Sequence, residues 1–563
     1  MQNKRSILWF VFAFSLVMLY DGWQRHLGHP TMFGMSMETP DVQANNAANK
    51  STKNSDVAVP ADTKVAASAK AETAIEPNAN NAQRGEIVKV KTDLLALEFN
   101  TQGAVLQRAE LLKQGDLTDK TKNMVLLDKS SERTYLAQTG LTGGTLPNHK
   151  TIYKLETNSR ELADGKDSLD LVFIGESGGV QVKQTYTLKR GSYTIAVKHE
   201  VVNKGEEVVT PSLYLQLTRD GNKPEVHSQI LSTFTPTTFT GPAVYSEEKK
   251  FQKVEFKSIA DDKKERHLKE GQQTWIAMIQ HYYVSAWIPK DQGTHEFRTT
   301  KVADNLYSVA NIQALGSLTS GANKTIESSL YVGPQDQKAL EALAPGLDLV
   351  ADYGWLAIIA KPIFAFLQLL HTLTDNWGWA IILLTISLKL AFFPLSAAGY
   401  KSMARMKKVT PRMQALKEKY GDDRAKLNQA MMELYRTEKI NPLGGCFPML
   451  IQIPVFIALY WVLLASVEMR SAPWMGWIQD LATPDPFYIL PAIMMASMFV
   501  QFKLNPTPVD PMQQKIMMIM PLVFGVMFFF FPAGLVLYWV VNNILSIAQQ
   551  WAINKQLEKA GLK

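Results

Sequence analysis

Residues 377–398 read WGWAIILLTISLKLAFFPLSAA, and Lys389 is the only charged residue among them. A bilayer core about 30 Å thick needs about 20 apolar residues in a helix, so this stretch predicts a transmembrane span. Three further apolar stretches follow, at residues 446–467, 487–502 and 516–551. The last is too long for one crossing and is interrupted at residues 532–534, which predicts two helices joined by a tight turn. We therefore expect a membrane protein, although the mean hydropathy of −0.08 is typical of a soluble one.

The N-terminus resembles a signal sequence, because Lys4 and Arg5 precede the uncharged stretch Ser6–Tyr20. No small-x-small cleavage site follows, which favours an uncleaved signal-anchor helix over residues 1–23, with a cleaved signal peptide as the alternative. Residues 24–85 are expected to form a flexible tether, because their polar composition offers too little apolar surface to offset the entropy of ordering. With this anchor the chain of 563 residues has six predicted spans.

Residues 86–345 show a different pattern, with short alternating polar and apolar runs separated by turn residues. In Val180–Val202 two such runs flank Arg190 and Gly191, which predicts a hairpin of two strands. Ser212–Thr218 and Trp275–Ile288 predict further strands. The domain is therefore expected to be an all-β sandwich on the exported side of the membrane.

No catalytic motif connects the histidines and carboxylates of this exported domain, so we expect no catalytic residues there. The chain has a single cysteine, Cys446. This excludes an intramolecular disulfide and any metal site built from cysteines alone. We expect neither a metal nor another cofactor.

The membrane part is predicted to begin with an interfacial amphipathic helix at residues 346–375, since charges and a Lys361-Pro362 pair interrupt its apolar pattern. A second transmembrane helix is expected at residues 376–400, and helices three to six at residues 442–551. Residues 552–563 are predicted to be a short cytoplasmic tail.

The distribution of charge predicts the topology. The segment 401–441 carries eleven basic and five acidic residues, a net charge of +6, whereas residues 468–486 carry one basic and three acidic residues. Under the positive-inside rule the first segment is cytoplasmic and the second lies outside. Six spans then place the N-terminus and the C-terminus in the cytoplasm and the β domain outside.

The basic segment 401–441 is predicted to be a helical hairpin. Thr410-Pro411 is typical of a helix start, and Gly421-Asp422 of a stop followed by a new N-cap. Each arm has one apolar stripe; the stripes are formed by Met413, Leu416 and Tyr420 and by Leu427, Met431 and Leu434. The stripes either pack on each other or bind a cytosolic partner.

Lys389 is the candidate functional residue of the membrane part. Ionisable residues within a membrane normally face protein or a water-filled cavity and indicate function. The alternative is a lysine whose ammonium snorkels to the cytoplasmic surface. The other predicted spans contain no carboxylate to pair with it. Its expected neighbours are neutral hydrogen-bonding residues, namely Thr385, Gln452, Asn542 and Ser546.

The sequence resembles the YidC/Oxa/Alb family of membrane protein insertases, in the Gram-negative form that has a large periplasmic domain. The matching segments are Asn441–Pro448 (NPLGGCFP), Asp510–Met517 (DPMQQKIM), Phe531–Tyr538 (FPAGLVLY) and Trp275–Pro289 (WIAMIQHYYVSAWIP). Together the segments extend the resemblance over nearly the whole chain except the tether.

The resemblance implies an α+β membrane protein of the bacterial inner membrane. Its parts are a signal anchor, a periplasmic β-supersandwich and a five-helix transmembrane core with a cytoplasmic helical hairpin. The core surrounds a hydrophilic groove whose cation matches Lys389, where family members usually have arginine. A substrate-helix exit surface would lie along Tyr538, Trp539, Tyr460 and Pro454.

The implied function is insertion and chaperoning of membrane proteins, without enzymatic activity, nucleotide or metal. The implied partners are nascent membrane proteins, the lipid bilayer, the Sec translocon and the ribosome–nascent-chain targeting machinery, with no recognition of a nucleic-acid sequence. Two other classes stay open on the residues alone. One is a transporter or channel, for which an inverted repeat and paired intramembrane charges are missing. The other is a membrane-tethered carbohydrate enzyme or binding protein.

Overall fold

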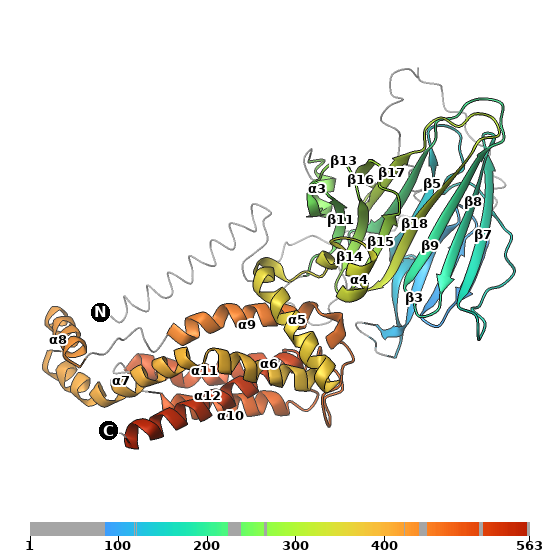
Figure 1. Ribbon diagram of the computed structural model, residues 1–563. Coiled ribbons are helices and arrows are strands. Elements are labelled where there is room, and N and C mark those ends of the chain that lie inside the picture. Colours follow the sequence, from blue (N-terminus) through green and yellow to red (C-terminus); the bar gives the residue numbers. More distant parts are fainter. Residues whose placement is uncertain are drawn as a thin grey trace, which may run out of the picture. The chain divides into compact units, whose positions relative to one another are not determined.

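The computed structural model describes residues 85–116, 119, 121–222, 238–263, 267–420, 423–438, 447–505 and 511–559. The described chain forms a β-rich unit that ends at Ala351 and a helical unit that begins at Asp352 (Figure 1). The predicted anchor at residues 1–23 and the predicted tether at residues 24–85, except residue 85, lie outside the described residues.

The β-rich unit consists of two nine-stranded antiparallel sheets. The first contains, in spatial order, β1 (Ile87–Lys91), β2 (Leu95–Asn100), β3 (Val105–Gly115), β4 (Asn123–Lys129), β5 (Thr134–Thr142), β10 (Ser212–Asp220), β17 (Leu306–Ala314), β16 (His295–Ala303) and β13 (Glu270–Gly271). The second contains β12 (Lys250–Lys253), β11 (Gly241–Ser246), β14 (Trp275–Gln280), β15 (Tyr283–Pro289), β18 (Asn323–Pro334), β9 (Thr194–Asn203), β8 (Val180–Lys189), β7 (Ser168–Ser177) and β6 (Lys154–Leu155). The short helices α3 (Phe256–Ala260) and α4 (Gln337–Leu343) complete the unit.

The predicted hairpin at Val180–Val202 is confirmed as β8 and β9, whose alternate residues are buried. Gly191 in the turn has a φ of +69°, a conformation that glycine adopts without steric cost. The stretch Trp275–Ile288 forms a second hairpin, β14 and β15, because Tyr282 turns the chain with a φ of +67°. The predicted all-β sandwich is therefore confirmed.

Several polar side chains form hydrogen bonds between the two sheets. Tyr135 on β5 donates a hydrogen bond to the Met278 carbonyl at 3.1 Å, and the Trp287 indole N–H donates to the Gln216 carbonyl at 3.1 Å. Thr139 donates to the Tyr214 carbonyl at 2.9 Å, so its hydroxyl oxygen is left to accept from Nε2 of His199 at 3.0 Å. The bonds of Tyr135, Trp287 and His199 join the two sheets and favour this one arrangement of the sheets, because an unpaired polar group at this depth is costly.

His199 is fully buried, and its Nδ1 has no hydrogen-bond partner among the described residues. Burial in the sandwich disfavours the charged imidazolium and lowers the pKa of His199 to about 4. In the unfolded chain the His199 imidazole binds a proton near pH 6.5, whereas in the folded chain it binds one only near pH 4. The stability contributed by neutral His199 is therefore complete above pH 6.5 and is lost as the pH falls toward 4.

We predict that the β-rich unit loses about 2 kcal/mol of unfolding free energy through His199 between pH 7.5 and pH 5. Denaturant unfolding of the full chain at both pH values measures this loss. The variant His199→Gln keeps an N–H donor for Thr139 but has no titrating group, so it should show a smaller loss. An equal loss in the variant and the wild type would show that His199 is not the group responsible.

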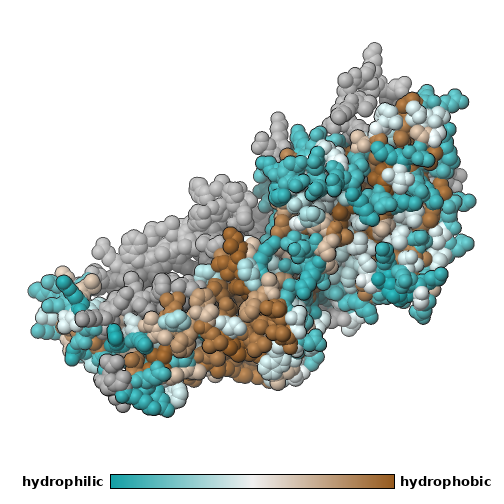
Figure 2. Space-filling model, in the orientation of Figure 1, coloured by the Kyte–Doolittle hydropathy of each residue, from teal (hydrophilic) through white to brown (hydrophobic). Residues whose placement is uncertain are grey.

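The helical unit contains eight α-helices among the described residues (Figure 1). They are α5 (Ala357–Thr374), α6 (Trp377–Ala391), α7 (Phe393–Tyr420), α8 (Arg424–Thr437), α9 (Phe447–Ala465), α10 (Ile489–Leu504), α11 (Pro511–Phe528) and α12 (Ala533–Lys559). The predicted break between the last two helices is confirmed, but it lies at residues 529–532, because α12 already begins at Ala533. Figure 2 shows that the face of this unit in view is largely apolar, as expected for a surface that contacts lipid.

Two boundaries differ from the prediction. The second span, expected as one helix over residues 376–400, is broken at Phe392, where α6 and α7 meet with a bend of 67°. Pro394 lacks an N–H and cannot continue the hydrogen-bond ladder of α6, which explains the break. Conversely, Pro411 does not start a helix, because α7 runs through it. The carbonyl that loses its partner there belongs to exposed Lys407 and can bind water.

The number of spans stays a prediction. Among the described helices, only α5 is by itself long and apolar enough to cross a membrane, and the bent pair of α6 and α7 passes the same test together. Helices α9, α10 and α11 contain shorter apolar segments of 14 to 16 residues, at Gln452–Ala465, Ile489–Leu504 and Gln514–Phe528. One side of α5 packs against α6 and α9 through buried residues that include Ile363 and Leu367.

Helices α7 and α8 pack against each other, and the predicted apolar stripes take part through Met413 on α7 and through Met431 and Leu434 on α8. Val409 and Met413 on α7 are buried against Met431 and Leu434 on α8. Asp423 caps α8 by accepting a hydrogen bond from the Lys426 backbone N–H at 3.1 Å, close to the predicted N-cap. Self-packing is therefore the alternative that the contacts support.

Candidate functional site

The site is built around α12, and the start of that helix is fixed by the loop between α9 and α10. The backbone N–H groups of Ala533 and Gly534 donate to the carbonyls of Thr483 and Leu481 at 2.8 and 2.9 Å. Those N–H groups would otherwise be unpaired at a helix start. The loop itself is anchored by buried Asp485, which accepts hydrogen bonds from the Trp477 indole and from the backbone N–H groups of residues 487 and 490.

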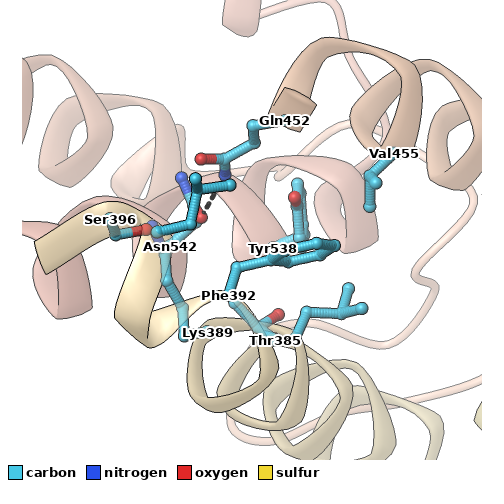
Figure 3. A pocket seen from close by; sticks show the side chains of 10 residues that line it. Thr385, Lys389, Phe392, Ser396, Gln452, Val455, Tyr538 and Asn542 are labelled. Carbon is cyan, nitrogen blue, oxygen red and sulfur yellow. Dashed lines mark hydrogen bonds between the residues drawn. The ribbon is translucent and has the colours of Figure 1, made fainter. Parts of the chain in front are cut away.

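A pocket opens between α6, the first turn of α7, α9 and α12 (Figure 3). It holds about 440 Å³ of free space, including its open mouth. The lining residues are Thr385, Leu388, Lys389, Phe392, Leu395, Ser396, Gln452, Val455, Tyr538 and Asn542. Of these ten residues only Lys389 carries a charge, so the pocket is a polar, cationic cavity within an otherwise apolar bundle.

Lys389 is held by α12. Its ammonium Nζ donates to the Ser546 hydroxyl at 2.7 Å, and that hydroxyl donates in turn to the Asn542 carbonyl at 2.7 Å. The ammonium has three donors and this contact uses one of them. Because Ser546 is neutral, the positive charge of Lys389 is not compensated by this contact and remains available to an anionic group.

A second contact connects α9 to α12 across the pocket. The Gln452 amide Nε2 donates to the Asn542 side-chain oxygen at 2.5 Å (Figure 3). Asn542 therefore takes part in both contacts, through its side chain toward Gln452 and through its carbonyl toward Ser546.

The structure brings the five predicted groove residues together, although they make different contacts in and behind the pocket. Lys389, Gln452 and Asn542 line the pocket with polar atoms, and Ser546 lies behind Lys389 as its hydrogen-bond acceptor. Thr385 also lines the pocket, but its hydroxyl donates to the Ile381 carbonyl of its own helix at 2.7 Å.

Sequence reasoning missed some of the site. Phe392 and Ser396 line the pocket because of the bend that follows α6. Tyr400 on α7 lies near Ser546. The signal that could have indicated these residues was Pro394, which marks the break in the helix and hence a change in the direction of the following side chains.

The predicted exit residues do not form one surface. Phe456 on α9 contacts Tyr460, Tyr538 and Trp539, with ring centroids 6.5, 6.3 and 4.7 Å away. Tyr538 is only 3% exposed and faces the pocket, so it does not lie on an exposed lipid-facing surface. Tyr460, Trp539 and Pro454 are each partly exposed. Trp539 also contacts Phe528 at 5.2 Å, just before the turn into α12.

No three His, Cys, Asp or Glu side chains meet as a metal site within the part of the chain that the structure describes. A β-sandwich unit and a helical unit with a cationic polar pocket define the class of the protein: a membrane protein that exposes a hydrophilic site within an apolar helical bundle. Comparison with known proteins then gives the family.

Two family models match the chain. That of the 60Kd inner membrane protein matches residues 369–560, and that of the YidC periplasmic domain matches residues 87–366. The membrane protein insertases YidC of Bordetella petrii and Cupriavidus necator are 54% and 52% identical to this chain. The alignments cover 99% of this chain in both cases, and 99% and 98% of the relatives.

A solved structure, an active YidC insertase with the first transmembrane domain resolved, is 18% identical to this chain. The match covers 83% of this chain and 94% of that one, with a TM-score of 0.38.

The chain belongs to the YidC family of membrane protein insertases. This is a family of inner membrane proteins and not of enzymes. The family decides against a transporter or channel and against a tethered carbohydrate enzyme as the function of this chain.

We predict that Gln452 and Asn542 stabilise the helical unit jointly. A double-mutant cycle of Gln452→Leu and Asn542→Leu should give a coupling free energy of about 1 kcal/mol, the size usual for interhelical hydrogen bonds in membranes. Thermal unfolding of the detergent-solubilised chain measures it. The matched cycle of Gln452→Leu and Asn543→Leu should show little coupling, because Asn543 bonds to Ser497 on α10 instead. Equal coupling in both cycles would contradict a direct bond.

Proposed function

We propose that this chain inserts membrane proteins by receiving a hydrophilic segment of its substrate in the pocket around Lys389. The observation that carries the proposal is the ammonium of Lys389, which is bonded to a neutral serine in a pocket with no other charged lining residue. A cation in such a site attracts an acidic or polar segment, because the attraction is stronger than it would be in water.

The substrate's apolar helix would meanwhile move into the bilayer along partly exposed aromatic residues on α9 and α12, chiefly Tyr460 and Trp539. Partition of that helix into lipid supplies the driving force, so the mechanism requires neither nucleotide nor metal. The pocket shortens the apolar distance that the polar segment must cross, which lowers the barrier to its transfer.

The proposal includes the domain boundaries and the topology predicted from the sequence. The β-rich unit is placed in the periplasm, and both termini and the hairpin of α7 and α8 in the cytoplasm. The net charge of +6 on residues 401–441 supports this orientation. The proposed partners are nascent membrane proteins, which membership of the family supports, together with the Sec translocon and the ribosome–nascent-chain targeting machinery, which the sequence resemblance implies.

We predict that the charge of Lys389 determines insertion of acidic substrates. Lys389→Arg should retain insertion, because arginine keeps the charge. Lys389→Ala should impair insertion more as acidic residues are added to the translocated tail, and Lys389→Glu should be worst because it repels them. Protease protection of one single-span substrate with zero to three acidic tail residues, in vesicles of each variant, gives the measurement.

The matched control is Lys503 at the end of α10, which is exposed and does not line the pocket. Lys503→Glu should leave the whole substrate series unaffected. If the Lys389→Ala and Lys389→Glu variants insert every member as well as the wild type, Lys389 is a snorkelling residue and the proposed site is wrong.

A further inference from the structure

The hairpin helix α7 carries a row of basic side chains on one face. The residues are Lys401, Arg405, Lys408, Arg412 and Lys419, and all five are exposed. At 3.6 residues per turn these positions lie within a sector of about 60° around the helix. We call this row the basic stripe. The stripe contains no acidic residue.

The basic stripe lies apart from the packing face of α7. Val409 and Met413, which are buried against α8, lie about 100° around the helix from the stripe. Arg412 pairs with Glu438 at 2.5 Å but keeps 68% of its side chain exposed. Lys419 stacks over the neighbouring Tyr420 ring at 5.1 Å. The stripe is therefore a surface that hairpin formation leaves uncovered.

The bend between α6 and α7 keeps the stripe close to the membrane. The apolar side chains of Leu390, Phe392 and Phe393 are exposed at the bend, which favours apolar surroundings for it, and no charged residue follows until Lys401. If α6 stands along the membrane normal, a helix bent by 67° rises along that normal by only about 0.6 Å per residue. Lys401 then lies about 5 Å beyond the level of Phe393, and Lys419 about 15 Å beyond it.

These heights match the polar layer of a bilayer and one Debye length beyond it. We propose that the basic stripe binds anionic phospholipid headgroups of the leaflet from which α7 emerges, and so holds the hairpin along the membrane surface. The partner is argued from charge complementarity and from continuity with the apolar residues at the bend. Basic clusters immediately after a membrane helix have this affinity in general. The inference concerns the hairpin alone and does not rest on the proposed role of Lys389.

A pair of adjacent probe positions tests which face of α7 meets the lipid. Ala415 lies at the edge of the sector that the basic stripe occupies. Gln414 lies about 100° from Ala415 around the helix, on the side away from the packing face. Both residues are exposed. After Cys446→Ser removes the single native cysteine, Ala415→Cys and Gln414→Cys each accept one fluorophore. The full chain is reconstituted in vesicles of phosphatidylcholine, alone or with about one third phosphatidylglycerol, that contain a quencher on the headgroup.

We expect the fluorophore at position 415 to be quenched about twofold or more in the anionic vesicles relative to the neutral ones, and the difference to disappear at high salt. The fluorophore at position 414 should change little. Equal quenching of position 415 in both kinds of vesicle would overturn the proposal.

Two triple variants with the same change in charge supply the control. The first variant removes three charges from the stripe and combines Lys401→Gln, Arg405→Gln and Lys408→Gln. The second removes three charges from elsewhere on the hairpin and combines Lys407→Gln, Lys426→Gln and Arg436→Gln. Both sets leave the Arg412–Glu438 pair intact. Only the first set should abolish the gain in quenching at position 415, and equal effects of the two sets would overturn the proposal.

The alternative is that the basic stripe binds nucleic acid, and a separate titration distinguishes it. A short RNA duplex is titrated onto the full chain in neutral vesicles at the same salt concentration. The stripe binds nucleic acid, and the membrane proposal is wrong, if two results occur together. The stripe variant binds the RNA duplex more weakly than the other triple variant, and anionic lipid does not change the quenching at position 415. Binding of RNA at the same strength by both variants, together with lipid-dependent quenching, supports the membrane.

Discussion

Hydrogen bonds from α12 hold the helical unit together. Within a membrane, apolar contact between helices gains little over contact with lipid, so interhelical polar contacts and close packing decide which helices associate. Asn542 bonds to α9, Ser546 to α6 and Asn543 to α10, while Gln550 caps the end of α10 through Asn505 at 3.1 Å. Because one helix carries all these contacts, a change in its rotation would separate three neighbours at once.

The same helix connects stability to the site. Asn542 and Ser546 hold the bundle through groups that also shape the pocket, so the structure gains its polar cavity from contacts that it needs for assembly. Lys389 fits this arrangement because a serine hydroxyl positions its ammonium without neutralising it. A carboxylate in that place would have cancelled the charge that a substrate can use, and the desolvation of a buried ion pair often costs as much as its Coulombic attraction returns.

The fold could be read from the sequence where periodicity is strong. Alternation in Val180–Val202 predicted β8 and β9, and the interruption at residues 532–534 predicted the turn before α12. The bend at Phe392 was not predicted, because hydropathy is uniform across it and only Pro394 marks it. Pro411, unlike Pro394, does not break a helix, because the carbonyl that loses its hydrogen-bond partner can bind water instead.

For the site, the sequence by itself determined the kind of residue: one intramembrane cation, Lys389, among neutral hydrogen-bonding side chains. Only the tertiary structure decided which of these converge. Asn542 and Asn543 are neighbours of identical chemistry, yet the first faces the pocket and the second faces α10. Tyr538 and Trp539 differ in the same way, as only Tyr538 lines the pocket. Neighbouring positions on a helix point about 100° apart, and the rotation of α12 that assigns them is set by its contacts with other helices, which no local pattern encodes.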